Sequence, residues 1–313
     1  MSRIHEALKK AEQERAVMLP VDVAALPTEP LGIESNGGNR APVAAADVHP
    51  KTSVVASPSS DYLRFDDLSA RCAHPRWQPD RNVNVFMNSD LSIHGAEQFR
   101  TLRSRLYQLR GTQPLKTILV TSSLPADGKT FVANNVAQAI VQQPDRRVLL
   151  IDADLRRSRL HVPLGAPVSP GLTEYLRGEA DEFAVIQHGH EGNLFLIAGG
   201  NDVADPSELL SNGRLRLLLD RVTPVFDWVI LDSPPCLPVA DASVLADLCD
   251  GVLLVVRAGS TPMEAALRTS QELQGRNVLG VVLNAVEKEH AYLHYYGHYG
   301  YSRDPNSFTE PRK

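Results

Sequence analysis

The residues best suited to chemistry lie together in the stretch 122–130, which reads Ser-Ser-Leu-Pro-Ala-Asp-Gly-Lys-Thr. An apolar run before it predicts a buried strand over 117–120, and the residues after it predict a helix over 131–140. A strand, a tight loop ending in Gly-Lys-Thr and a helix hold nucleotide phosphates through backbone N–H groups and the helix N-terminus. We therefore expect Lys129 to reach the β- and γ-phosphates of a nucleotide and the Thr130 hydroxyl to bind Mg²⁺.

The loop departs from the usual Gly-x-x-x-x-Gly-Lys-Ser/Thr pattern at one position, where Ser123 replaces the first glycine. Gly128 is in place, so we expect an intact loop. The alternative is a chance Gly-Lys-Thr in a turn, which the flanking strand and helix disfavour. The residues predicted to bind the nucleotide phosphates are Ser123, Pro125, Ala126, Asp127, Gly128, Lys129 and Thr130.

Carboxylates follow directly after two other apolar runs. Asp152 and Asp154 follow one run, with Arg156 two residues further on, and Asp232 follows the other. A carboxylate at the end of a buried strand is costly unless it meets a cation, and Mg²⁺ beside nucleotide phosphates is such a cation. In phosphoryl transfer, a carboxylate orients or deprotonates the acceptor while cations stabilise the phosphate charge. The alternative is that these aspartates only cap helices. The presence of three aspartates together with a phosphate loop disfavours this alternative.

The elements that must position these residues alternate along the chain. Buried strands are predicted over 117–120, 147–151, 193–197, 228–231, 251–256 and 279–283. Helices are predicted over 95–109, 131–140, 207–222, 239–248 and 262–274. Continuous apolar strands alternating with helices predict an α/β fold of the P-loop NTPase type, with a mostly parallel sheet covered by helices on both faces. Ligands of such folds bind beyond the carboxyl ends of the strands.

Composition shifts divide the 313 residues into four parts. A short amphipathic helix is predicted over 1–16 and a proline-rich flexible linker over 17–82. The globular domain is predicted over 83–288, followed by a tail over 289–313. The net charge of −5 does not favour nucleic-acid binding. The three cysteines do not favour a disulfide framework, which indicates a reducing cytoplasm. No apolar run is long enough to span a bilayer and no secretory signal is present, so we expect any membrane link to come through a partner.

The tail concentrates hydroxyl groups that could accept a phosphate. Five of the eight tyrosines of the chain fall within ten residues, beyond the last predicted strand. A polar, glycine-containing tail cannot bury these rings in a core of its own. An aromatic docking strip is the alternative interpretation. The five residues are Tyr292, Tyr295, Tyr296, Tyr299 and Tyr301.

Three segments, at 123–130, 149–156 and 229–235, resemble the Walker A, Walker A′ and Walker B motifs of the bacterial tyrosine kinases. These are P-loop autokinases of exopolysaccharide and capsule production, and the resemblance covers the chain from about residue 83 to its end. The segment 205–210 also resembles a recurrent segment of the family. The first residues of the chain resemble those of members encoded with exosortase-type systems.

The resemblance implies roles for individual residues. Lys129 would bind ATP, Asp152 would activate the acceptor tyrosine hydroxyl, and Asp154 would support it. Thr130, Asp154 and Asp232 would hold Mg²⁺. Weaker candidates for the nucleotide site are Arg257 and Asn284. The spacing of Arg156 after Asp152 and Asp154 separately predicts a guanidinium that binds phosphate on the same side of the extended chain.

A charged trio on the first predicted helix of the domain has two interpretations. Glu97, Arg100 and Arg103 are spaced three apart, which by itself favours a solvated, salt-bridged surface. The resemblance instead implies that these three residues form an oligomerisation motif. It also implies that a neighbouring subunit of the oligomer phosphorylates the tail. The partners implied are further copies of the chain, a membrane-anchored polysaccharide co-polymerase as activator and a tyrosine phosphatase. We therefore expect a cytoplasmic protein recruited to the inner face of the membrane.

Two other functions remain open from the sequence. Switch ATPases of the chromosome-partitioning or division-site type place a lysine four residues before the glycine of Gly-Lys-Thr, where this chain has Leu124. They also lack a tyrosine-rich tail. The other alternative is a non-catalytic, nucleotide-dependent scaffold for polysaccharide assembly, which the complete set of lysine and aspartates argues against.

Overall fold

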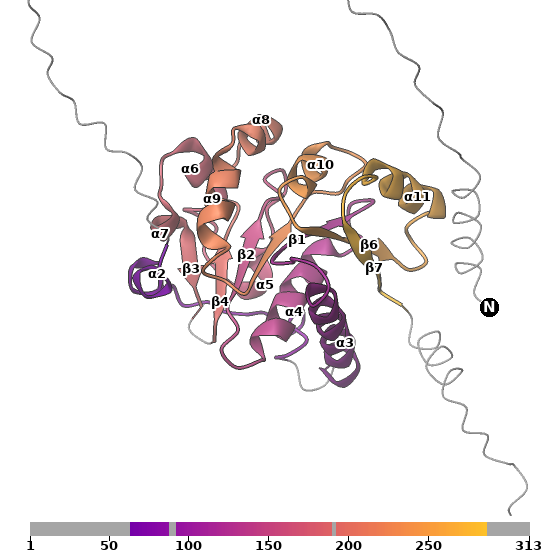
Figure 1. Ribbon diagram of the computed structural model, residues 1–313, viewed down its shortest axis with the longest axis horizontal. Helices are drawn as coiled ribbons and strands as arrows, with labels where there is room; N and C mark the ends of the chain where they lie inside the picture. The colour runs from indigo at the N-terminus through magenta and orange to yellow at the C-terminus, as the bar shows by residue number, and fades with distance from the viewer. Residues whose placement is uncertain (1–62, 88–91, 190–191, 287–313) are drawn as a thin grey trace, which may run out of the picture. The chain divides into compact units, whose positions relative to one another are not determined.

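The computed structural model describes residues 63–87, 92–189 and 192–286, and Figure 1 shows their arrangement. The predicted helix over 1–16, the linker up to residue 62 and the tyrosine-rich tail lie outside the described residues.

A seven-stranded sheet forms the centre of the described part, in the order β3-β4-β2-β5-β1-β6-β7. Every neighbouring pair is parallel except β3 and β4. The predicted P-loop type of α/β fold, with a mostly parallel sheet, is thereby confirmed. The strands are β1 Thr117–Ser122, β2 Val148–Asp152, β3 Ile186–His188, β4 Leu194–Ile197, β5 Trp228–Asp232, β6 Gly251–Arg257 and β7 Val278–Asn284.

Helices cover both faces of the sheet (Figure 1). One face packs against α3 Ser92–Arg110, α4 Lys129–Val141 and α5 His161–Leu164. The other packs against α2 Phe65–Arg71, α6 Leu172–Arg177, α7 Glu182–Val185, α8 Pro206–Ser211, α9 Arg214–Val222, α10 Asp241–Ala246 and α11 Met263–Glu272. Because successive strand residues point to opposite faces, Ile118 and Val120 join the first core and Leu119 joins the second.

Some elements differ from the prediction, and the short helices α5, α6 and α7 were not predicted at all. The helix expected over 207–222 is two helices, α8 and α9, because Gly213 adopts a left-handed conformation with φ of 84° between them. The antiparallel strand β3 was not predicted. It contains only three residues, of which Gln187 and His188 are polar, so its apolar signal is too weak to indicate a strand.

The end of the predicted linker is also corrected. Residues from Leu63 onward are folded: Leu63, Leu68 and Cys72 are buried in the core beneath α2. Ala73 then forms a parallel bridge with Gln187 of β3. The burial of this segment comes from its contacts with distant parts of the chain, whereas its own prolines and short apolar content are typical of a linker. Within the described residues, no helix combines the length and apolarity needed to cross a bilayer.

Candidate active site

The predicted phosphate loop connects β1 to α4. Its backbone takes two left-handed turns, at Ala126 with φ of 67° and at Gly128 with φ of 96°. The Leu124 N–H donates to the Asp127 carboxylate at 2.9 Å, which closes the loop. Gly128 stands at the N-cap of α4 and has no side chain to cap the first N–H groups of the helix. These N–H groups and the helix dipole therefore remain able to bind an anion.

Residues at the ends of β6 and β7 brace this loop from behind. Asn284 Nδ2 donates to the Asp127 carbonyl at 2.9 Å, and Arg257 donates to the Ala126 carbonyl at 3.2 Å. Thr261 Oγ1 donates to Asp127 Oδ1 at 2.7 Å. A Cβ atom on Gly128 would lie 2.0 Å from Asn284 Nδ2, so the loop needs glycine there for space as well as for φ. Arg257 and Asn284, predicted as candidates for the nucleotide site, thus touch the loop itself.

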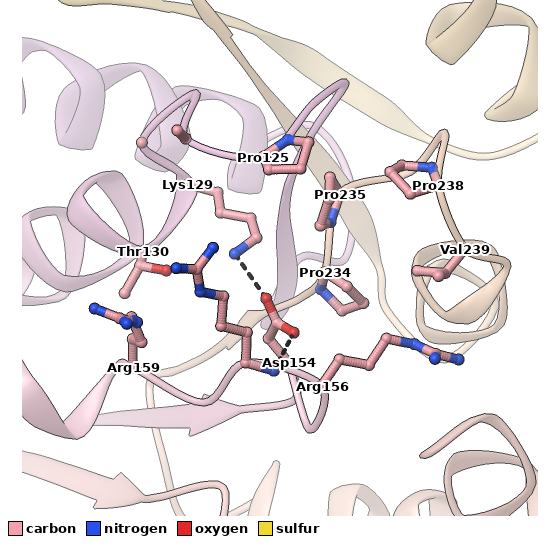
Figure 2. Close-up of a pocket in the computed structure, with 13 residues that line it drawn as sticks. Pro125, Lys129, Thr130, Asp154, Arg156, Arg159, Pro234, Pro235, Pro238 and Val239 are labelled. Carbon is pink, nitrogen blue, oxygen red and sulfur yellow. Dashed lines mark hydrogen bonds and ion pairs between the residues drawn. The ribbon is translucent and has the colours of Figure 1, made fainter. Parts of the chain in front are cut away.

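Two side chains at the start of α4 contact the carboxylates that follow the other strands. Lys129 Nζ lies 2.9 Å from Asp154 Oδ2, and both side chains are largely buried. Figure 2 marks this contact with a dashed line. Thr130 Oγ1 donates to Asp232 Oδ2 at 2.5 Å. The other carboxylate oxygen of Asp232 is buried and has no hydrogen-bond partner among the described residues. A hydroxyl oxygen beside a carboxylate oxygen without a hydrogen-bond partner provides two oxygen ligands of the kind that a hard cation such as Mg²⁺ prefers.

Strand pairing places two buried carboxylates side by side, because Asp152 of β2 is in register with Asp232 of β5. Burial raises the pKa of Asp232, which Lys129 opposes and the Asp152 charge reinforces. Burial also raises the pKa of Asp152. The pKa of Lys129 is raised because the charges of Asp232 and Asp154 outweigh the effect of burial. Lys129 therefore remains a cation, able to bind phosphate.

The two aspartates after β2 have different surroundings. Asp152 is fully buried and accepts hydrogen bonds from Ser158 Oγ at 2.7 Å and from the Leu160 N–H at 2.9 Å. It also accepts one from the Asp154 N–H at 3.2 Å. These bonds make Asp152 the anchor of the loop that follows β2. Asp154 is also buried, and it accepts hydrogen bonds from Lys129 Nζ and from the Arg157 N–H at 3.1 Å, but unlike Asp152 it lines a cavity beside Lys129.

Arg156 is engaged away from the phosphate loop. Its guanidinium donates to both carboxylate oxygens of Asp241, at 2.7 and 3.2 Å, and to Ser207 Oγ at 2.7 Å. Ser207 Oγ in turn donates to Asp241 at 2.6 Å. Burial alone would raise the pKa of Asp241, but the bonds from Arg156 and Ser207 lower it. This cluster, which we call the Arg156 clasp, joins the loop after β2 to α8 and α10.

The partners of Arg156 were not predicted. Ser207 lies in the segment 205–210, which resembles a family segment but gave no indication of a structural role. Asp241 is an acidic residue at the start of α10, which is ordinary for a helix and gave no signal of a partner.

The cavity has a volume of about 390 Å³ and brings together the loop, the carboxylate and residues that follow β5 (Figure 2). Arg157, Arg159 and the residues after β5 were not among the predicted site residues, although the run Asp-Ser-Pro-Pro is plain in the sequence. The lining residues are Pro125, Ala126, Gly128, Lys129, Thr130, Asp154, Arg156, Arg157, Arg159, Pro234, Pro235, Pro238 and Val239.

The charged trio on α3 does not line this cavity. Arg100 forms an exposed ion pair with Glu97 one turn away. Arg103 donates to the carbonyl of Ala139 on α4 at 2.6 Å, and so contacts its own chain. The tail tyrosines lie outside the described residues.

A strand, a left-handed glycine loop and a helix that begins with Lys-Thr, faced by carboxylates on the neighbouring strands, define a P-loop nucleotide-binding protein. No family model matches the sequence. The chain is 33% identical over 220 residues to tyrosine-protein kinase YwqD of Bacillus subtilis, a match that covers 69% of this chain and 92% of the relative. It is 39% identical over 210 residues to tyrosine-protein kinase Etk of Escherichia coli, covering 66% of this chain.

A solved structure of the Etk kinase domain superposes with a TM-score of 0.62 at 34% identity, covering 67% of this chain and 83% of that domain. The chain therefore belongs to the bacterial tyrosine-protein kinases, and it is a protein-tyrosine kinase. It spans 29% of the length of the Etk relative but 92% of YwqD. The narrower likeness of its first residues to exosortase-associated members stays a prediction.

Proposed function

We propose that this kinase transfers the γ-phosphate of ATP to tyrosines in the C-terminal tail of a second copy of the chain, and that this cycle regulates exopolysaccharide production. The observation that carries the proposal is the contact of Lys129 with Asp154 inside one cavity, beside the phosphate loop. A phosphate-binding cation and a carboxylate able to receive a proton are the two groups that phosphoryl transfer to a hydroxyl requires.

The phosphate loop and Lys129 would bind the ATP phosphates. Thr130 and Asp232 would hold Mg²⁺. The sequence also predicted Asp154 as a ligand, but we propose a different role for it below. The ion would neutralise charge on the phosphates as they react. Among the described residues, no three His, Cys, Asp or Glu side chains form a cluster suited to a metal. Mg²⁺ does not require such a cluster, because it usually binds one or two carboxylates together with substrate phosphates.

The surroundings of the two aspartates favour a division of labour different from the one that the resemblance implies. Asp152 has its oxygens engaged by Ser158, Leu160 and the Asp154 N–H. The oxygens of Asp154 are engaged as well, by Lys129 and the Arg157 N–H, but Asp154 is the one of the two that lines the cavity, so we assign it the role of base. The phenol oxygen of the acceptor forms a bond to the γ-phosphorus, the bond from that phosphorus to ADP breaks, and the phenolic proton passes to Asp154.

Regulation would follow from charge. Each phosphotyrosine adds roughly 1.5 to 2 negative charges, so a phosphorylated tail would be repelled by its neighbours and would favour disassembly of the homo-oligomer. Glu97 and Arg100 are exposed on α3, which leaves them accessible to a neighbouring copy. A membrane-anchored co-polymerase as activator and a phosphatase that resets the tail complete the proposal, which places the chain at the inner face of the membrane.

The experiment that tests this function is mass spectrometry of the C-terminal peptide after incubation with Mg²⁺ and ATP. Wild type is compared with Lys129→Met, and transfer between copies is tested by mixing Lys129→Met with an active chain whose five tail tyrosines are phenylalanine. We expect phosphotyrosine between 292 and 301 in wild type and on the Lys129→Met chain of the mixture. ATP consumption without phosphotyrosine would instead indicate a switch ATPase.

A further inference from the structure

One side of the cavity is formed by residues that no part of the phosphate chemistry uses. Pro234, Pro235, Pro238 and Val239 follow Asp232 at the end of β5 and line the cavity together. We call these four residues the proline wall. Pro234 is buried, whereas Pro235 and Val239 are half-buried and Pro238 is exposed. The proline side chains present only carbon, and proline has no backbone N–H to donate.

The proline wall is fixed to the same strand that carries the phosphate loop. The Pro234 carbonyl accepts hydrogen bonds from Thr121 Oγ1 at 3.0 Å and from Ser233 Oγ at 3.1 Å. The Cys236 N–H donates to the Ser122 carbonyl at 2.8 Å. These bonds tie residues 234–236 to β1, so the part of the wall formed by Pro234 and Pro235 keeps a constant position relative to the loop.

The cavity is therefore divided in its chemistry (Figure 2). Lys129, Thr130 and Arg159 lie on one side, and the proline wall lies on the other, where Figure 2 also shows Arg156, whose guanidinium is paired with Asp241. Figure 2 shows Asp154 between them, with Lys129 to one side and Pro234 to the other. A ligand that matches this arrangement has a flat apolar body against the prolines and a hydroxyl at its end that reaches Asp154.

A phenol ring has that shape. We propose that the proline wall binds the ring of the acceptor tyrosine, and that it gives the enzyme its preference for tyrosine over serine and threonine. An aromatic ring covers a large apolar area in one rigid group, whereas the short side chains of serine and threonine cannot cover the wall while their hydroxyl reaches Asp154. The inference rests on the proposed kinase function and adds the residues that select its substrate.

The test measures acceptor and ATP dependence separately. The enzyme is the full chain with its five tail tyrosines replaced by alanine, and the acceptor is a synthetic peptide of residues 291–302. Val239→Ser and Pro235→Ala each remove apolar surface from the wall, and Val162→Ser is the matched control, because Val162 is exposed on α5 and does not line the cavity. We expect KM for the peptide to rise about tenfold in the wall variants while KM for ATP changes less than about twofold. Thermal unfolding of every variant checks that it folds.

A second measurement tests the ring directly. A peptide with phenylalanine in place of every tyrosine keeps the rings and should compete with the acceptor peptide, whereas a peptide with alanine at these positions should not. Equal inhibition by both peptides, or an unchanged peptide KM in the wall variants, would overturn the inference and leave the kinase function intact.

A rise in KM for ATP alone would show that the wall binds the adenine ring instead, which also overturns the inference. If the parent enzyme forms no phosphotyrosine on the peptide and its tail-intact form forms none on itself, the proposed function fails, and the inference fails with it.

Discussion

The Arg156 clasp makes a sharp prediction about stability and catalysis together. Replacing Arg156 by glutamine removes both bonds to Asp241, whose carboxylate is only 1% exposed. The carboxylate then keeps Ser207 as its donor, but it loses its only neutralising partner in the clasp. Replacing Asp241 by asparagine removes the charge while it preserves the shape.

The magnitude follows from burial. Breaking a fully buried ion pair costs about 3–5 kcal/mol. The Arg156 side chain is 38% exposed, so water replaces part of what is lost, and we expect about 2 kcal/mol of unfolding free energy for Arg156→Gln. We expect about 1 kcal/mol for Asp241→Asn, because a neutral amide still accepts a bond from Arg156. In a domain of this size, 1 kcal/mol corresponds to roughly 2–4 °C in Tm.

The assay is a double-mutant cycle in urea, with both single variants, the double variant and wild type. Because the two side chains act on each other, the double variant should be at least about 1 kcal/mol more stable than the sum of the single effects predicts. The clasp also holds the loop that carries Asp154, so kcat for tail phosphorylation should fall while KM for ATP stays the same. Additivity to within about 0.5 kcal/mol would refute the reasoning, as would a loss of stability with unchanged kcat.

Three further predictions test other parts of the structure. Gly128→Ala should weaken ATP binding more than tenfold in a nucleotide titration, because the added Cβ meets Asn284 and a left-handed backbone costs alanine about 1–2 kcal/mol. Gly213→Ala is the control for backbone strain, because Gly213 has a similar φ but open space around it. Leu68→Ala should cost about 2–5 kcal/mol in urea unfolding if α2 belongs to the domain, and a loss below about 0.5 kcal/mol would place it in the linker. The bonds from Arg156 and Ser207 lower the pKa of Asp241 below its ordinary value of 3.8, so the stability that they contribute is present above that pH and is lost as the pH falls below it. Wild type should therefore lose more unfolding free energy than Asp241→Asn between pH 5 and about 2. Parallel stability curves for the two proteins would contradict this.

Much of the fold was predictable because its signals are local. Each buried strand is a continuous apolar run, and the phosphate loop lies within nine consecutive residues. The α2 segment shows the opposite case. Leu68 is fully buried, yet its neighbours in the sequence are those of a linker. Contacts with distant segments make this part of the chain join the core: Ala73 bridges to β3, Phe65 packs against Phe195 of β4, and α2 packs against α7.

The candidate site divides in the same way. The sequence alone predicted which residues are candidates to bind phosphate and metal, because Lys129 and Thr130 start the helix after β1 and the aspartates follow strands whose ends a parallel sheet brings to one edge. The tertiary structure decided how each of them is used. Asp152 is enclosed and Asp154 faces the cavity, although they are two residues apart.

Arg156 is held by partners 51 and 85 residues away, and the prolines that complete the cavity follow a different strand from the loop they face. The physical reason is that local sequence sets backbone propensity and the kind of group present. The partner, burial and direction of a side chain depend on segments that meet only when the sheet and its helices pack together.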